Sequence, residues 1–232
     1  MTFEEIFSTY YIEFRADSDV PDITDPEYLM AKKFANVAIN KWKQVDGVLW
    51  NELWTSRAIS EEGDDTIVAG QLEYEAPDDF VFPGGYIRLG GGDQSSQILQ
   101  VYSPEEAQTM RGTFAYFTGN PADGYMLRLS SVADNLAGLA IDYDYYRAPV
   151  LMENASDIPD MADPYFIVNS MLADRFRGAR NFPAYQTAKR DADSALQNMI
   201  TRNAMGTPTR GWTIRDTVPG FGSNNINDRF GI

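Results

Sequence analysis

The amino-acid sequence predicts an α+β protein in which an antiparallel helical bundle is interrupted by a small antiparallel β-sandwich or barrel. Apolar residues recur with the helical period of 3.6 near both ends of the chain, and alternate with a period of two between about residues 66 and 150. Amphipathic helices at the two ends cannot bury their apolar faces alone, so we expect two N-terminal and two C-terminal helices to pack together. The predicted domains are a discontinuous helical bundle at 1–60 and 160–205, an inserted β-domain at 61–159 and an extended C-terminal arm at 206–232.

The first two helices have recognisable starts. Thr2 and Glu5 have the spacing of a capping box, and an apolar face with helical spacing follows: Phe3, Ile6, Phe7, Tyr10, Tyr11 and Phe14. A second helix is predicted to begin at Pro26, since proline fits the first helical turn, where no N–H donor is needed. Its apolar stripe predicts a helix that runs toward Arg57, with a bend or break at Gly47.

Short alternating segments separated by glycine and proline turns predict the β-domain. The expected strands are 72–76, 80–82, 86–89, 98–102, 113–117, 125–129 and 139–146. Between two of them, Ser103-Pro104-Glu105-Glu106 predicts the capped start of a short helix. The glycine-rich run Gly90-Gly91-Gly92-Asp93 lacks the Gly-Lys-Ser/Thr that follows in a phosphate-binding loop, so a hairpin turn is the better interpretation.

Helical periodicity returns at Pro164 and, after an interruption at 178–183, continues from Pro183 to Gly206. The remainder, 206–232, is rich in glycine and proline and has no period, yet it contains large apolar side chains that would be wasted in solvent. We therefore expect an arm that becomes ordered when it docks on a partner. Its candidate anchors are aromatic, aliphatic and cationic: Arg210, Trp212, Ile214, Arg215, Phe221, Arg229 and Phe230.

Composition excludes several classes of function. The chain has neither cysteine nor histidine, which removes Ser-His-Asp and Cys-His catalysis, His/Cys zinc sites, haem held by these residues, and disulfides. With 19 basic and 34 acidic residues the net charge is −15, which is unfavourable for binding DNA by phosphate neutralisation. Neither a signal peptide nor an apolar run long enough to span a bilayer is visible. We expect no enzyme activity, no cofactor, no metal and no membrane contact, in a protein made and kept inside a cell or particle.

The charge is unevenly distributed along the chain. Residues 1–160 contain 28 acids and 10 bases, whereas residues 161–232 contain 6 acids and 9 bases. An acidic body with a mildly basic tail favours contacts between copies of the chain or with another protein.

Three residue groups are candidate ligand sites. Asp142 and Asp144 share a strand face and could offer oxygens to a hard cation, although a strand with one polar and one aromatic face is the simpler interpretation. A second acidic group has the composition of a calcium-binding loop: Asp17, Asp19, Asp22 and Asp25. It lacks the glycine and the terminal glutamate of such a loop, so a linker with helix-capping aspartates is the favoured interpretation. The third group could stack sugars or bases, but core and interface positions are favoured: Trp42, Trp50 and Trp54.

One stretch carries a resemblance to a known family. A strand ends in Ile141-Asp142-Tyr143-Asp144-Tyr145-Tyr146-Arg147-Ala148-Pro149-Val150-Leu151, then come Asp157-Ile158-Pro159-Asp160-Met161 and a helix opening with Pro164-Tyr165-Phe166. This Tyr-Tyr-Arg-x-Pro exit, acidic Asp-x-Pro link and capped helix resembles the head-to-tail adaptor proteins of tailed bacteriophages. It is most similar to the larger adaptors, the tail tubular A type of short-tailed phages. That type has a helical bundle interrupted by a β-domain, and a C-terminal arm.

The resemblance implies a structural virion protein at the head-tail interface, assembled in the host cytoplasm. It implies a ring of about twelve copies under the portal that extends the DNA channel and offers the tail a docking platform. The implied partners are further copies of the chain, the portal protein and a tail or nozzle protein, with the seven arm residues binding the portal or a neighbour. DNA would pass through an acidic channel without specific binding.

Two alternatives from other classes stay open. In a carbohydrate-binding β-module, aromatic and acidic residues would gather on one face of the sheet. In a carboxylate-based, metal-dependent hydrolase, Asp142 and Asp144 would hold the ion.

Overall fold

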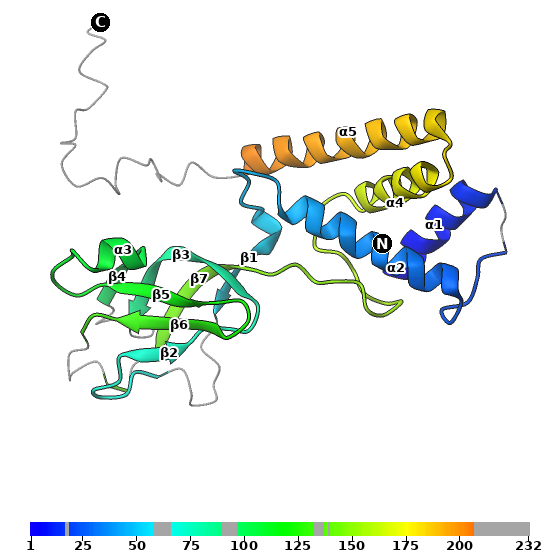
Figure 1. Cartoon of the computed structure of the whole chain (residues 1–232). Coiled ribbons are helices and arrows are strands. Elements are labelled where there is room, and N and C mark those ends of the chain that lie inside the picture. The colour runs from blue at the N-terminus through cyan, green and yellow to red at the C-terminus, as the bar shows by residue number, and fades with distance from the viewer. Residues whose placement is uncertain (17–18, 58–65, 90–96, 132–136, 139, 207–232) are drawn as a thin grey trace, which may run out of the picture.

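A computed structural model describes residues 1–232 except 17–18, 58–65, 90–96, 132–136, 139 and 207–232. The four long helices gather at one end of the molecule, and a curled sheet with one short helix lies at the other (Figure 1). The predicted α+β class is confirmed. In the part of the chain that the structure describes, no helix is both long and apolar enough to cross a membrane.

The helices at the two ends of the chain contribute to one hydrophobic core. They are α1 (Phe3–Arg15), α2 (Pro26–Lys43), α4 (Tyr165–Gly178) and α5 (Phe182–Gly206). Helix α4 contacts each of the other three and is buried over most of its surface, as its apolar sequence requires. The core includes Phe3, Phe7 and Trp42, all with at most 1% of their surface exposed.

The N-terminal capping box of α1 is confirmed. The Thr2 hydroxyl accepts a hydrogen bond from the Glu5 backbone N–H at 3.3 Å, and the Glu5 carboxylate accepts one from the Thr2 backbone N–H at 2.9 Å. Two N–H groups that a helix start leaves without partners are satisfied in this way.

Helix α2 is shorter than the sequence predicts, because it ends at Lys43 rather than running toward Arg57. Gly47 adopts a φ of +74°, a conformation that glycine tolerates and that turns the chain away from the helix axis. Trp50 then folds back, and its indole N–H donates to the Trp42 carbonyl at 2.9 Å, which satisfies an acceptor near the helix end. The chain continues through a 3₁₀ turn into strand β1 (Trp54–Arg57).

The described strands form a single curled sheet with the order β1-β7-β3-β4-β5-β6-β2. Of the two predicted forms, a sandwich or a barrel, the sheet resembles half of a barrel and is not a two-layered sandwich. The sheet is mixed, which corrects the prediction of an antiparallel one, because β4 and β5 pair in parallel across the short helix α3 (Pro104–Ala107). The other strands are β2 (Glu73–Glu75), β3 (Phe80–Leu89), β4 (Gln97–Tyr102), β5 (Ala115–Asn120), β6 (Gly124–Leu129) and β7 (Ile141–Arg147). Strand β1 shows that the sheet begins before the expected boundary at residue 61.

Strand β3 merges two predicted strands. Its pairing with β7 shifts register between Pro83 and Ile87, where Gly84 and Gly85 lie, so the glycines mark a bulge within a strand instead of a turn between two. The concave side of the curled sheet holds a second core of buried side chains, separate from the helical core: Ile67, Tyr74, Phe80, Ile87, Leu89, Leu99, Ala115, Phe117, Leu127, Leu129, Ile141, Tyr143 and Tyr145.

Candidate functional site

The predicted arm anchors lie outside the described residues: Arg210, Trp212, Ile214, Arg215, Phe221, Arg229 and Phe230. The same is true of Asp17 and of the run Gly90–Asp93. Their proposed roles therefore stay predictions.

Two aspartates of the acidic linker, Asp22 and Asp25, have local roles. Asp25 caps α2, since its carboxylate accepts from the Glu27 backbone N–H at 2.7 Å, and the Asp22 carboxylate accepts from the Ile23 N–H at 2.6 Å. Within the described ranges, no three acidic side chains converge in a way that could hold a metal ion.

The three tryptophans do not form one platform. Trp42 and Trp50 stack in the helical core with ring centroids 4.9 Å apart and are at most 2% exposed, which fits the favoured core interpretation. Trp54 is separated from them by the turn into β1. It is partly exposed and packs edge-on against Tyr146 of β7, with centroids 4.9 Å apart.

The Tyr-Tyr-Arg motif lies where the sheet joins the helices. The Tyr145 hydroxyl donates to the Asp79 carboxylate at 2.8 Å, and Tyr146 packs against the helical core. Arg147 forms an ion pair with Asp160, whose second oxygen accepts from the Val150 backbone N–H at 2.8 Å. The residues that carry the family resemblance thus connect the two parts of the molecule.

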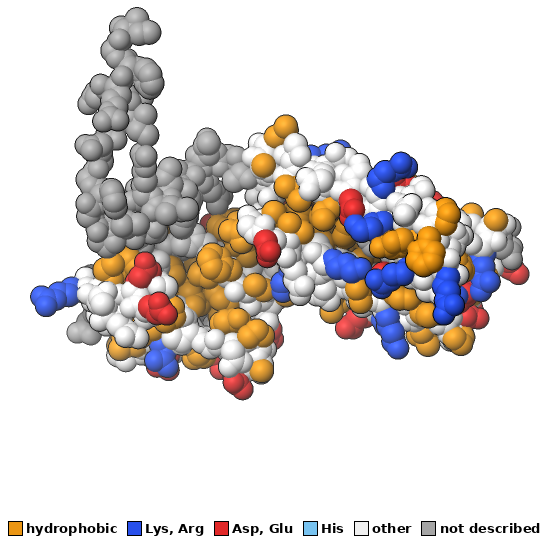
Figure 2. Space-filling model, turned by 45° about the horizontal axis from the view of Figure 1, so that its top comes forward, with side chains coloured by type: hydrophobic (Ala, Val, Ile, Leu, Met, Phe, Trp, Pro, Cys, Tyr) orange, Lys and Arg blue, Asp and Glu red, His pale blue; other side chains and the backbone are white. Residues whose placement is uncertain are grey.

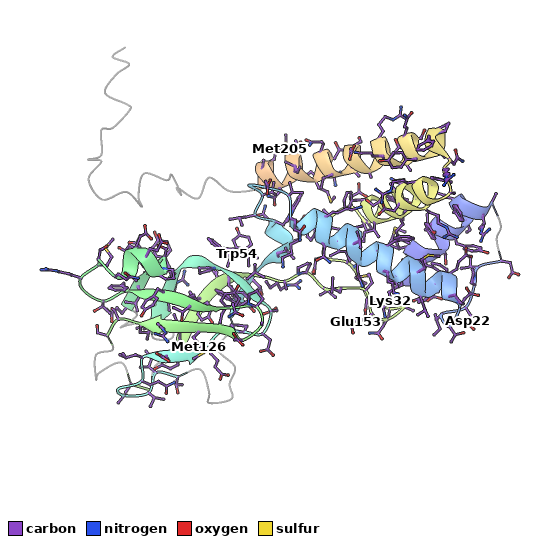
Figure 3. All side chains as sticks on the ribbon, viewed as in Figure 1. Asp22, Lys32, Trp54, Met126, Glu153 and Met205 are labelled. Atoms are coloured by element: carbon purple, nitrogen blue, oxygen red, sulfur yellow. The ribbon has the colours of Figure 1, made fainter. Side chains whose placement is uncertain are left out.

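The link between β7 and α4 is fastened to α1 and α2. The backbone N–H groups of Phe3 and Glu4 donate to the carbonyls of Asp157 and Ala155 at 2.7 and 2.9 Å, which satisfies the start of α1. The Lys32 ammonium donates to the Glu153 carbonyl at 2.8 Å (Figure 3).

Asp157 makes the stability of this link depend on pH. Backbone N–H groups of Asn154 and Glu153 each donate to its carboxylate at 2.7 Å, and these hydrogen bonds lower the pKa of Asp157 below its ordinary value. Because the folded-state pKa is the lower one, the stabilisation is present above the unfolded-state pKa and is lost as pH falls through the folded-state pKa. We expect an NMR titration of this carboxyl to give a midpoint below the ordinary aspartate value. A midpoint at or above that value would contradict the assignment.

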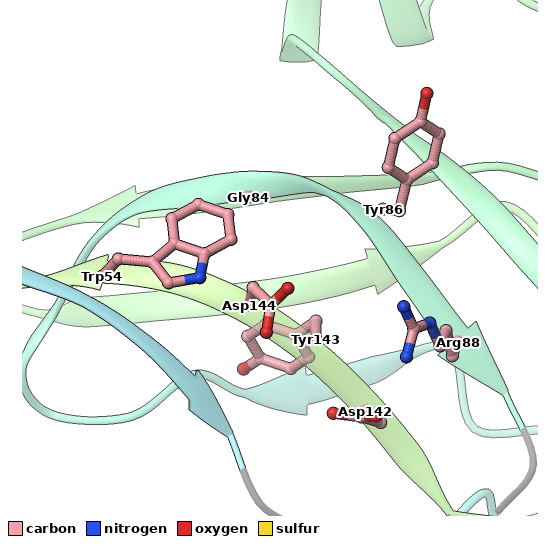
Figure 4. Close-up of a pocket in the computed structure, with 7 residues that line it drawn as sticks. All are labelled: Trp54, Gly84, Tyr86, Arg88, Asp142, Tyr143 and Asp144. Atoms are coloured by element: carbon pink, nitrogen blue, oxygen red, sulfur yellow. The ribbon is translucent and has the colours of Figure 1, made fainter. Parts of the chain in front are cut away.

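A pocket of about 320 Å³ opens on the convex face of the sheet, where β1, β3 and β7 lie side by side (Figure 4). The strand period places Asp142 and Asp144 on this face while Ile141, Tyr143 and Tyr145 are buried, as predicted for a strand with one polar and one aromatic face. The pocket is lined by residues from all three strands: Trp54, Gly84, Tyr86, Arg88, Asp142, Tyr143 and Asp144.

Gly84 is required by the packing of the pocket. A Cβ atom at this position would lie 2.7 Å from the Trp54 ring and would collide with the Asp144 carbonyl. The glycine bulge therefore allows Trp54 to lie close against strand β3.

The charged groups of the pocket differ in their partners. Asp144 accepts a hydrogen bond from the Ser56 hydroxyl of β1. Arg88 and Asp142 occupy opposite positions in the register of β3 and β7, yet neither has a hydrogen-bond or ion-pair partner among the described residues. The spacing Asp142-x-Asp144 can be found in the sequence, but no pattern in the sequence connects it to Arg88, Tyr86 and Trp54. The paired glycines at 84–85, which mark the bulge, were the available signal.

The pocket can bind a polar molecule, because the carboxylates of Asp142 and Asp144 accept hydrogen bonds, the Arg88 guanidinium donates them, and aromatic side chains lie beside these groups.

No protein-family model matches this chain, and a search of curated proteins found no match.

Proposed function

We propose that this chain is a structural virion protein that forms a ring between the portal and the tail of a bacteriophage, with further copies, the portal and a tail protein as its partners. The proposal combines the family resemblance of segment 141–166 with the order of the elements. In it, α1, α2, α4 and α5 form the antiparallel bundle, the sheet is its insertion, and 206–232 is the arm that binds the portal or a neighbour.

The observation that best supports ring formation is a separation of charge between the four long helices and the rest of the chain, which includes the links between them. The four long helices carry ten Lys and Arg residues against seven Asp and Glu residues, although the whole chain has a net charge of −15. The rest of the chain therefore has a net charge of −18. On the face of the molecule shown in Figure 2, many of the Lys and Arg side chains lie over the helical end.

This separation suits a head-to-tail contact between copies. If the cationic surface of the long helices in one copy meets an acidic surface of the next copy, the two contacting surfaces differ, and such heterologous contacts close into rings when the rotation allows. The acidic surface also suits a channel through which DNA slides, because it offers few cations for phosphate groups.

The proposal is tested by mixing the full-length protein with purified portal rings of the same virus at low and high salt. Mass photometry is expected to show portal complexes that contain about twelve added copies. The complexes should weaken at high salt because exposed charges are screened. A protein that stays monomeric and leaves the portal mass unchanged at every salt concentration would contradict the proposal.

A further inference from the structure

The pocket on the convex face of the sheet has no role in the proposed ring, but its lining is that of a ligand site. Arg88 and Asp142 are direct cross-strand neighbours that do not form an ion pair, and the described residues provide neither with another partner. A cross-strand pair of opposite charge ordinarily interacts. Here both groups line the pocket, where a ligand can accept from the guanidinium and donate to the carboxylate.

The charge of the pocket selects against anions. Two carboxylates, of Asp142 and Asp144, outnumber the single guanidinium of Arg88, and the surrounding part of the chain is strongly acidic. A phosphate, a nucleotide or a uronic acid would meet a repulsive potential. A cation would in turn meet the Arg88 guanidinium, so a ligand that contacts all three charged groups is best uncharged, with several hydroxyl groups that donate to the carboxylates and accept from Arg88.

The aromatic residues of the pocket favour a ligand that also has an apolar face. Figure 4 shows Trp54 at one end of the lining residues and Tyr86 and Arg88 at the other, with the two carboxylates between them. Tyr86 is 53% exposed, so its ring presents apolar surface to the solvent. A sugar ring combines an apolar C–H face, which gains dispersion energy against an aromatic ring, with an edge of hydroxyl groups.

From this combination we propose that the pocket binds an uncharged saccharide. Its hydroxyl groups donate to Asp142 and Asp144 and accept from Arg88, and a sugar ring packs against Trp54 or Tyr86. The volume of about 320 Å³ lies at the lower end of small-molecule sites, which suits one or two sugar rings rather than a long chain. This inference is independent of the ring proposal, because a virion component can carry such a site whether or not it binds a portal.

Saturation-transfer NMR on the full-length protein provides the first test. The uncharged probes are maltotriose, cellotriose and triacetylchitotriose, and trigalacturonate is the anionic counterpart. We expect saturable binding of at least one uncharged probe and no binding of trigalacturonate.

Matched variants locate the binding. Asp142→Asn is expected to weaken saccharide affinity about tenfold or more, because a hydroxyl loses a charged acceptor. Tyr86→Ala is expected to weaken it as well, whereas Tyr165→Ala, which changes an equally exposed tyrosine on α4, should leave it unchanged. Asp78→Asn, in the exposed turn before β3, is the control for the loss of one negative charge. Equal melting temperatures would show that all four variants are folded.

Three outcomes would overturn the proposal. The first is that none of the uncharged probes binds. The second is that binding persists in both Asp142→Asn and Tyr86→Ala. The third is that N-acetylargininamide binds in an Asp142-dependent way while the saccharides do not. The last result would assign the pocket to a guanidinium group, such as an arginine side chain of a protein partner.

Discussion

Replacing Trp42 by alanine is expected to lower the free energy of unfolding by about 3–5 kcal/mol, because the change removes a large, fully buried ring and leaves a cavity. Trp42 also stacks on Trp50, and the turn that ends α2 folds back onto this pair. The loss should therefore loosen both the helical core and the entry into β1. Chemical denaturation monitored by circular dichroism measures the effect.

Two variants serve as controls for Trp42→Ala. Leu49→Ala changes a side chain that is 52% exposed in the same turn, and should alter stability by less than about 0.5 kcal/mol. Trp42→Phe keeps an aromatic ring and removes an indole N–H that has no acceptor in the described part of the chain, so it should cost less than alanine. A cost below about 1 kcal/mol for Trp42→Ala would show that the helices do not share the core described above.

Asp160→Ala is expected to destabilise the protein by about 2 kcal/mol. The change removes a carboxylate that accepts from two donors at the junction of sheet and helices. Arg147 would lose its ion-pair partner while only 24% of its side chain is exposed, and the Val150 N–H would lose its acceptor. Thermal and chemical unfolding of the variant measure the cost.

The matched control is Asp193→Ala, which breaks an ion pair with Lys189 on the exposed surface of α5. Both side chains of that pair are more than half exposed, so its loss should cost no more than about 0.5 kcal/mol. Equal effects of Asp160→Ala and Asp193→Ala would show that the Tyr-Tyr-Arg motif does not stabilise the junction.

Local signals in the sequence predicted much of the fold. The capping box of Thr2 and Glu5, the proline starts of α2 and α3, and the separation of helical from alternating periods all have local physical causes, and they were confirmed. The predicted break at Gly47 was confirmed, but the continuation of α2 toward Arg57 was wrong, because the apolar stripe continues past Lys43 although the helix ends there. The merging of two strands into β3 was missed because glycines in a bulge resemble glycines in a turn.

The pocket could be predicted only in part. The alternation of Asp142 and Asp144 with aromatic residues was sufficient to place both carboxylates on one face of a strand. It could not supply Trp54 or Arg88, because these come from strands that become neighbours of β7 only through the order of the sheet. The partner of Arg147 likewise depends on how the link folds back, which no periodicity in the sequence describes.

The central claim is that this chain forms a ring on a portal and that its C-terminal arm binds there. It is tested most directly by electron microscopy of portal-bearing heads incubated either with the full-length protein or with a chain that ends at Gly206, the last residue of α5. The account predicts a ring of about twelve copies below the portal with the full-length protein, and no ring with the shortened chain. Heads without a ring in the presence of full-length protein, or with equal rings from both proteins, would contradict it.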